Sequence, residues 1–108
     1  MAWLVRDGEV LASVEVATGA GARARGLLGR DGLDGAMWLP GVKSVHSFGM
    51  RFDLDVAFVD ADGLVFKTVL LRRNRISAPH PRAGGVLEAQ AGAFREWTLH
   101  VGDVVEIR

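Results

Sequence analysis

The sequence predicts a mostly β fold, a small β-sandwich or barrel-like domain with one short helix near the N-terminus. Three observations predict it: the apolar stretches are short, turn residues separate them, and a single segment shows helical spacing. Short strands divided by turns are typical of small sandwiches and barrels. The length of 108 residues predicts a single domain over 1–108.

The chain is expected to begin with a hairpin followed by the helix. Residues 2–6 and 9–16 are apolar or alternating, and Asp7-Gly8 between them is a two-residue turn signal. Thr18 is a suitable N-cap for a helix over Gly19–Arg30, where apolar residues recur at helical spacing. Glycines inside this helix each cost about 1 kcal/mol relative to alanine, so tertiary packing must hold it.

The rest of the chain is predicted to alternate between short strands and loops. The clearest pair is Asp55–Val59 with Leu64–Leu71, joined by the acidic turn Asp60–Gly63. In the segment Val45–Met50, a strand would place His46, Phe48 and Met50 on one side. The remaining expected elements are strands at Ala36–Leu39, Val86–Ala91 and Val101–Ile107, and a turn or helical fragment at Ala93–Trp97.

Composition excludes several classes of function. The chain has no cysteine, which rules out disulfides, thiolate metal sites and a cysteine nucleophile. Its 13 Lys+Arg balance 13 Asp+Glu, and this zero net charge disfavours a nucleic-acid partner. No apolar run is long enough for a membrane span, and the first residues lack the pattern of an export signal, so we expect a cytoplasmic protein.

Charge is nevertheless segregated along the chain. No acid occurs between Leu64 and Leu87, a region that holds five basic residues, four of them in the loop Arg72–Arg82. One interpretation is a solvated loop that the neighbouring acidic turn balances. The other is an interaction module that acts through the basic loop.

Local motifs for catalysis or metal binding are missing from the sequence. His46, His80 and His100 lie far apart along the chain, so they form no local metal motif. None of the serines lies in a nucleophile elbow. We therefore predict no cofactor and no resident metal.

Four segments carry a resemblance to a known family. They are R-G-L-L-G-R at 25–30, V-H-S-F-G-M-R-F-D-L-D-V-A-F-V-D at 45–60, V-L-E-A-Q-A-G at 86–92, and Gly102-Asp103. Over about residues 18–107 the chain resembles the bacterial and archaeal family named "domain of unknown function 192". The resemblance implies a compact, mostly β fold with a short N-terminal helix, and it implies no activity. At two positions where the family usually has proline, this chain has Asp53 and Gln90 instead.

The residues that match the polar signature of the family are Arg25, Met50, Asp55, Glu88 and Asp103. Asp103 suits a tight turn. An ion pair of Arg25 with Asp55 or Glu88 would give these charges a structural role. Alternatively, a pocket could gather them with His46, since charged residues on apolar strands often mark sites.

The leading functional hypothesis is a binding domain without catalysis that takes a small ligand or a protein partner. Arg25 would bind an anionic group, and His46 would make a pH-sensitive hydrogen bond. One alternative is a small hydrolase or isomerase that uses His46 with Asp55, with or without a metal; the other is the interaction module described above. The full set of candidate ligand-binding residues is Arg25, His46, Phe48, Met50, Asp55 and Glu88.

Overall fold

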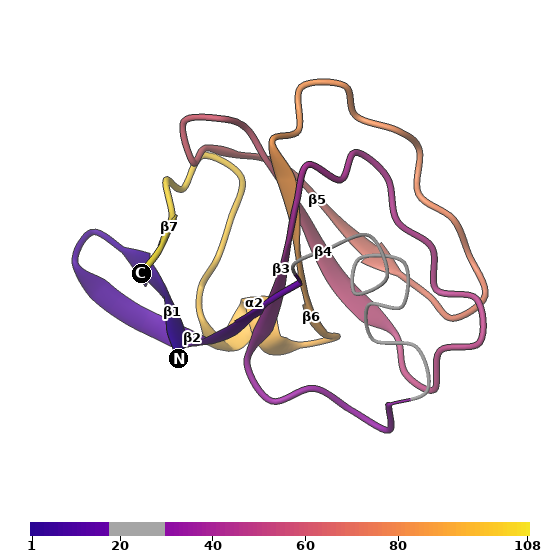
Figure 1. Ribbon diagram of the computed structural model, residues 1–108. Helices are drawn as coiled ribbons and strands as arrows, with labels where there is room; N and C mark the ends of the chain where they lie inside the picture. The colour runs from indigo at the N-terminus through magenta and orange to yellow at the C-terminus, as the bar shows by residue number, and fades with distance from the viewer. Residues whose placement is uncertain (18–29) are drawn as a thin grey trace.

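The computed structural model describes residues 1–17 and 30–108 of the chain (Figure 1). Within these residues the fold is mostly β, as predicted. The helix predicted over Gly19–Arg30 lies, except for its last residue, outside the described residues. The helix that the structure does describe is α2, Ala93–Glu96, near the C-terminus rather than the N-terminus. It lies where the sequence predicted a turn or helical fragment.

A seven-stranded sheet forms the body of the described structure, with the strand order β5-β4-β6-β3-β2-β1-β7. Neighbouring strands are antiparallel except β2 and β3, which are parallel. Parallel neighbours need a long crossover connection, and residues 17–35 supply it here. The strands are β1 (Ala2–Arg6), β2 (Glu9–Val16), β3 (Ala36–Pro40), β4 (Leu54–Val59), β5 (Val65–Leu71), β6 (Gly85–Gln90) and β7 (Glu106–Ile107).

The structure confirms the two hairpin turns that the sequence predicted, at Asp7-Gly8 and at Asp60–Gly63. Asp7 and Gly8, between β1 and β2, both have positive φ (51° and 78°), as a tight two-residue hairpin requires. Between β4 and β5, the Asp60 carboxylate accepts hydrogen bonds from the backbone N–H groups of Asp62 and Leu64, each at 2.9 Å. An aspartate in this role imitates a backbone turn.

The C-terminal segment brings the two ends of the sheet together and makes the fold barrel-like. The Val105 N–H donates to the Gly63 carbonyl at 2.9 Å, and the Val65 N–H donates to the Asp103 carbonyl at 2.8 Å. On its other side, β7 pairs with β1, and Trp3 and Arg108 exchange two backbone hydrogen bonds of 2.7 and 2.9 Å. Only the last two residues of the strand predicted at Val101–Ile107 form a regular strand, because the preceding residues bridge to the start of β5.

Apolar side chains form one cluster on each face of the sheet. Alternate residues of β4 divide between them: Leu54, Val56 and Phe58 join the first cluster, and Ala57 and Val59 join the second. The first cluster also includes Val45, Met50, Phe52 and Ala83, which come from loops. The second includes Phe94 of α2 and Val105. No helix of the described residues is long and apolar enough to cross a membrane.

The strand predicted at Val45–Met50 is wrong. This segment makes a single isolated bridge, between His46 and Ile76, and then turns through Gly49. As a result His46 and Phe48 are exposed while Met50 is buried, so the three side chains do not share a face. The reason is the hydrogen bonding: the backbone here pairs with another loop rather than with a strand of the sheet.

Candidate functional site

Two loops of similar length lie side by side next to the first apolar cluster (Figure 1). Residues 41–53 connect β3 to β4, and residues 72–84 connect β5 to β6. We name them the paired loops. Backbone hydrogen bonds tie them along their length: the Ser77 N–H donates to the Val45 carbonyl, and the His80 N–H donates to the Lys43 carbonyl, each at 2.8 Å. This ladder fixes their shape without a regular strand.

Ser47 holds the middle of the paired loops together. It is fully buried, and its hydroxyl donates to the Arg72 carbonyl and accepts the Arg75 N–H at 2.9 Å. Its own N–H donates to the Arg75 carbonyl at 2.8 Å, and its carbonyl accepts the Asn74 N–H at 3.0 Å. The hydroxyl of one fully buried side chain therefore satisfies two backbone groups of the neighbouring loop.

Replacing Ser47 with alanine is expected to lower the free energy of unfolding by about 1–3 kcal/mol, because the Arg75 N–H and the Arg72 carbonyl lose their partner in a partly buried place. Urea denaturation measures the change. Ser44→Ala, at a half-buried position of the same loop, is the matched control and should stay within about 0.5 kcal/mol. An equal loss in the two variants would contradict the role assigned to Ser47.

An apolar group lies at the surface of the paired loops. The rings of His46 and Phe48 stack with their centroids 5.1 Å apart, and the Phe48 N–H donates to His46 Nδ1 at 3.2 Å. Ile76, the bridge partner of His46, is 65% exposed and Phe48 is 49% exposed. These apolar side chains are in contact with water. A partner that covered them would gain free energy from their burial.

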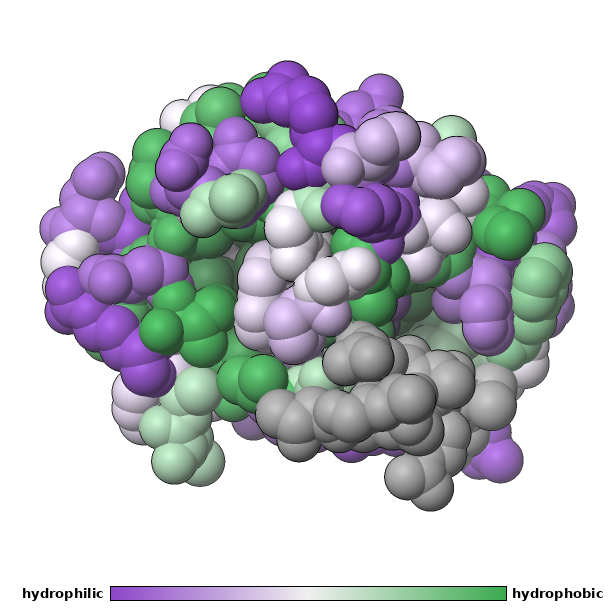
Figure 2. All heavy atoms as spheres, turned by 45° about the horizontal axis from the view of Figure 1, so that its top comes forward, coloured by the Kyte–Doolittle hydropathy of each residue, from purple (hydrophilic) through white to green (hydrophobic). Residues whose placement is uncertain are grey.

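Basic side chains accompany this apolar group. The paired loops contain six Lys and Arg residues and one acid, Asp53, although the whole chain is neutral. Arg72, Arg73 and Arg75 are exposed. Asp53 accepts a hydrogen bond from the Arg73 backbone N–H at 2.9 Å, but its distance to the Arg73 guanidinium is 3.9 Å. Figure 2 shows one face of the molecule, on which hydrophilic side chains separate several small apolar patches.

Glu88 lies in β6 on the face of the first apolar cluster. Its neighbours across the sheet are Met37 of β3 and Val56 of β4, both in that cluster. The residue is 4% exposed, and this burial raises the pKa of its carboxyl group from 4.5 to about 7. The fold therefore holds in its interior a carboxyl group that loses its proton at a higher pH than an exposed glutamate does.

Asp55 lies on the opposite face of the sheet from Glu88. In β4 it pairs with Ala89, the next residue of β6, and adjacent residues of a strand point to opposite faces. Its carboxylate accepts the backbone N–H groups of Gly92 and Phe94 at 2.9 and 3.1 Å, at the start of α2. Asp55 thus has a structural role in anchoring the short helix.

The six candidate ligand-binding residues therefore do not form one pocket. His46 and Phe48 lie together at the surface, Met50 is in the core, and Arg25 is outside the described residues. Asp55 and Glu88 lie on opposite faces. What sequence reasoning missed is that the paired loops bring His46 and Phe48 beside Arg72–Arg75. The sequence shows the basic loop itself, but no sequence signal indicates that this loop pairs with the His46 segment.

The geometry does not favour the hydrolase or isomerase alternative. The Asp55 carboxylate binds backbone N–H groups, and His46 stacks on Phe48 at the surface. A catalytic pair needs the base within hydrogen-bond reach of its partner. Among residues 1–17 and 30–108, no group of three or more histidine, aspartate or glutamate side chains could hold a metal ion.

Comparison with known proteins gives a family match and structural neighbours. Residues 2–107 match the family DUF192, described as "Uncharacterized ACR". A UPF0127 protein of Pyrococcus abyssi is 35% identical over 63 residues, which are 58% of this chain. That match spans about half (54%) of the length of the archaeal protein.

Two crystal structures share the fold. A protein of unknown function from Novosphingobium aromaticivorans has a TM-score of 0.79 at 21% identity, covering 97% of this chain and 82% of that one. A protein of Sinorhizobium meliloti, described as a candidate transcription regulator, has a TM-score of 0.80 at 22% identity, covering 97% and 90%. At these identities the likeness concerns the fold alone.

Proposed function

The chain belongs to the DUF192 family, which is uncharacterised, and we propose that it works as a binding domain without catalysis through the face of the paired loops. The observation that carries the proposal is the association of exposed apolar side chains, Phe48 and Ile76, with a basic surface on a hydrogen-bonded frame. A preformed surface of this kind binds without first ordering its own backbone.

The charge of this surface selects the partner. Arg72, Arg73 and Arg75 attract acidic groups, and Phe48 and Ile76 need an apolar residue to cover them. Arginine and aromatic residues are also the residue types most enriched at binding hot spots. The occupant is therefore an acidic segment of a partner protein that also carries apolar side chains.

Duplex DNA is the alternative that the experiment must separate from an acidic protein segment, because the relative from Sinorhizobium meliloti is described as a candidate transcription regulator. The zero net charge of the chain opposes DNA as the partner.

Three fluorescently labelled probes test the proposal by anisotropy: a peptide of glutamates interspersed with leucines, the same peptide with glutamines for glutamates, and a DNA duplex. We expect the acidic peptide to bind at least about tenfold more tightly than the other two, with an affinity that falls as salt rises. Replacing Arg72, Arg73 and Arg75 with serine should weaken its binding about tenfold or more, and Phe48→Ala should weaken it further.

The matched control replaces Lys67, Arg95 and Arg108 with serine, three exposed basic residues outside the paired loops, and it should keep the affinity of the parent protein. Circular dichroism checks that each variant is folded. Tighter binding of DNA than of peptide, or an unchanged peptide affinity in the triple arginine variant, would overturn the proposal. Failure of the acidic peptide to bind at all would count equally against it.

A further inference from the structure

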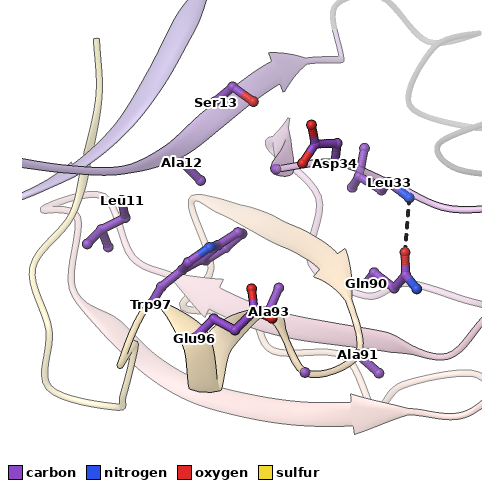
Figure 3. A pocket seen from close by; sticks show the side chains of 12 residues that line it. Leu11, Ala12, Ser13, Leu33, Asp34, Gln90, Ala91, Ala93, Glu96 and Trp97 are labelled. Atoms are coloured by element: carbon purple, nitrogen blue, oxygen red, sulfur yellow. Dashed lines mark hydrogen bonds between the residues drawn. The ribbon is translucent and has the colours of Figure 1, made fainter.

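A second feature, away from the paired loops, is a pocket of about 410 Å³ (Figure 3). It opens between β2, the segment before β3, and α2. Its volume falls within the range typical of small-molecule sites. The lining residues are Leu11–Ser13, Leu33–Gly35, Gln90–Ala93, Glu96 and Trp97.

Trp97 forms one wall of the pocket. Figure 3 shows its ring projecting between β2, at Leu11 and Ala12, and the helix α2. The ring is 5.8 Å from that of Phe94, centroid to centroid. Arg6 of β1 fixes the backbone behind it, because its guanidinium donates to the Trp97 carbonyl at 3.2 Å and to the Thr98 carbonyl at 2.6 Å. The aromatic wall is therefore positioned before any ligand arrives.

The opposite side of the pocket is also held in place. The Gln90 side-chain carbonyl accepts the Leu33 N–H at 3.4 Å, which joins the segment before β3 to the end of β6 (Figure 3). Gly35 approaches β2 so closely that a Cβ there would lie 2.5 Å from the Ser13 carbonyl oxygen. A pocket with walls fixed on both sides loses little entropy on binding.

The charges that line the pocket have one sign. Asp34 and Glu96 are its charged lining residues, and both are acids. Arg6, which holds the backbone behind the Trp97 wall, is already paired with Asp103 at 2.9 Å. The accessible lining is mainly polar, and leucine and alanine side chains supply its smaller apolar part. An indole face attracts cations through its negative quadrupole.

This combination fits an organic cation better than a metal ion. Hard metal ions need several oxygen or nitrogen ligands at short range, and the described residues contain no group of three or more histidine, aspartate or glutamate side chains that could hold one. An ammonium group needs only an aromatic face and a neighbouring carboxylate, and its carbon substituents need apolar walls. We propose that the pocket binds a compact organic ammonium ion, with Trp97 against the cation and Asp34 and Glu96 balancing its charge.

Choline and its neutral carbon isostere, 3,3-dimethyl-1-butanol, provide the test, because they differ in charge and hardly in shape. The Trp97 indole N–H signal in the nitrogen–proton correlation NMR spectrum reports occupancy of the pocket. We expect choline to shift this signal with a dissociation constant of about 1 mM, and the neutral isostere to bind at least about tenfold more weakly.

The variant Asp34→Asn with Glu96→Gln removes both charges and keeps the shape of the pocket. It should weaken choline about tenfold and leave the weak binding of the isostere unchanged. The matched control is Asp62→Asn with Glu106→Gln, which changes the net charge equally at exposed acids outside this pocket and should keep the parent affinity. Equal binding of the two probes, an unchanged choline affinity in the pocket variant, or no shift up to about 50 mM choline would overturn the proposal.

Discussion

Replacing Gly63 with alanine is expected to lower the free energy of unfolding by about 2–5 kcal/mol, because two separate costs fall on one residue. Gly63 has a φ of +86°, a conformation that costs a residue with a side chain about 1–2 kcal/mol. A Cβ would also lie 2.4 Å from the Val105 carbonyl oxygen, a backbone atom that no side-chain rotation can move. This is the point where the C-terminal segment joins the start of β5. Urea denaturation measures the loss.

Gly8→Ala separates these two costs. Gly8 has a similar φ of +78°, but no heavy atom lies within 4 Å of the position its Cβ would take. Its alanine variant should lose only the conformational part, about 1–2 kcal/mol. In addition, faster amide exchange at Val65 and Val105 is expected in Gly63→Ala alone, since these N–H groups make the closing hydrogen bonds. Equal destabilisation of the two variants would show that the close approach to Val105 is not a constraint.

Replacing Glu88 with glutamine is expected to raise the free energy of unfolding by about 3 kcal/mol at pH 8 and to change it little at pH 4. Burial raises the pKa of this carboxyl group from 4.5 to about 7 in the folded protein. Between these two values the folded state binds more protons than the unfolded state, so stability falls as the pH rises. Above pH 7 the folded protein carries the full cost of a buried charge, which the neutral glutamine avoids.

The measurement is urea denaturation of both proteins from pH 4 to pH 8, and the difference between them isolates Glu88 from all other titrating groups. Glu9→Gln, at an exposed position of β2, is the matched control and should shift the curve by less than about 0.5 kcal/mol at every pH. A pH-independent difference for Glu88→Gln would mean that the carboxyl group titrates in the same range in the folded and unfolded states.

The sequence predicted most of the sheet because local signals define it. Turns such as Asp7-Gly8 and Asp60–Gly63 and short apolar runs placed β1, β2, β4 and β5 close to their observed bounds. The segment Val45–Met50 failed because alternating polarity also fits an irregular loop whose partner is another loop. Period-two patterns identify which side chains are buried, but they do not identify the hydrogen-bond partner of the backbone.

The candidate site was predicted less well, because it depends on contacts between distant segments. His46 and Phe48 were selected from the sequence, and the structure places them beside the basic loop. Asp55 and Glu88 looked like one group, but their positions in the register of β4 and β6 put them on opposite faces. No local pattern encodes register between strands so far apart in the chain.

The hydrogen bonds between Trp3 and Arg108 have a consequence for how the protein folds. They join residues that are 105 positions apart, and they extend the pairing of β1 with its second neighbour, β7. Closing so long a loop costs entropy that other contacts must first offset. The hairpin β1–β2 can form early from neighbouring residues, but the barrel cannot close until nearly the whole chain is available. We therefore expect the C-terminal strand to pair with the first strand late in folding.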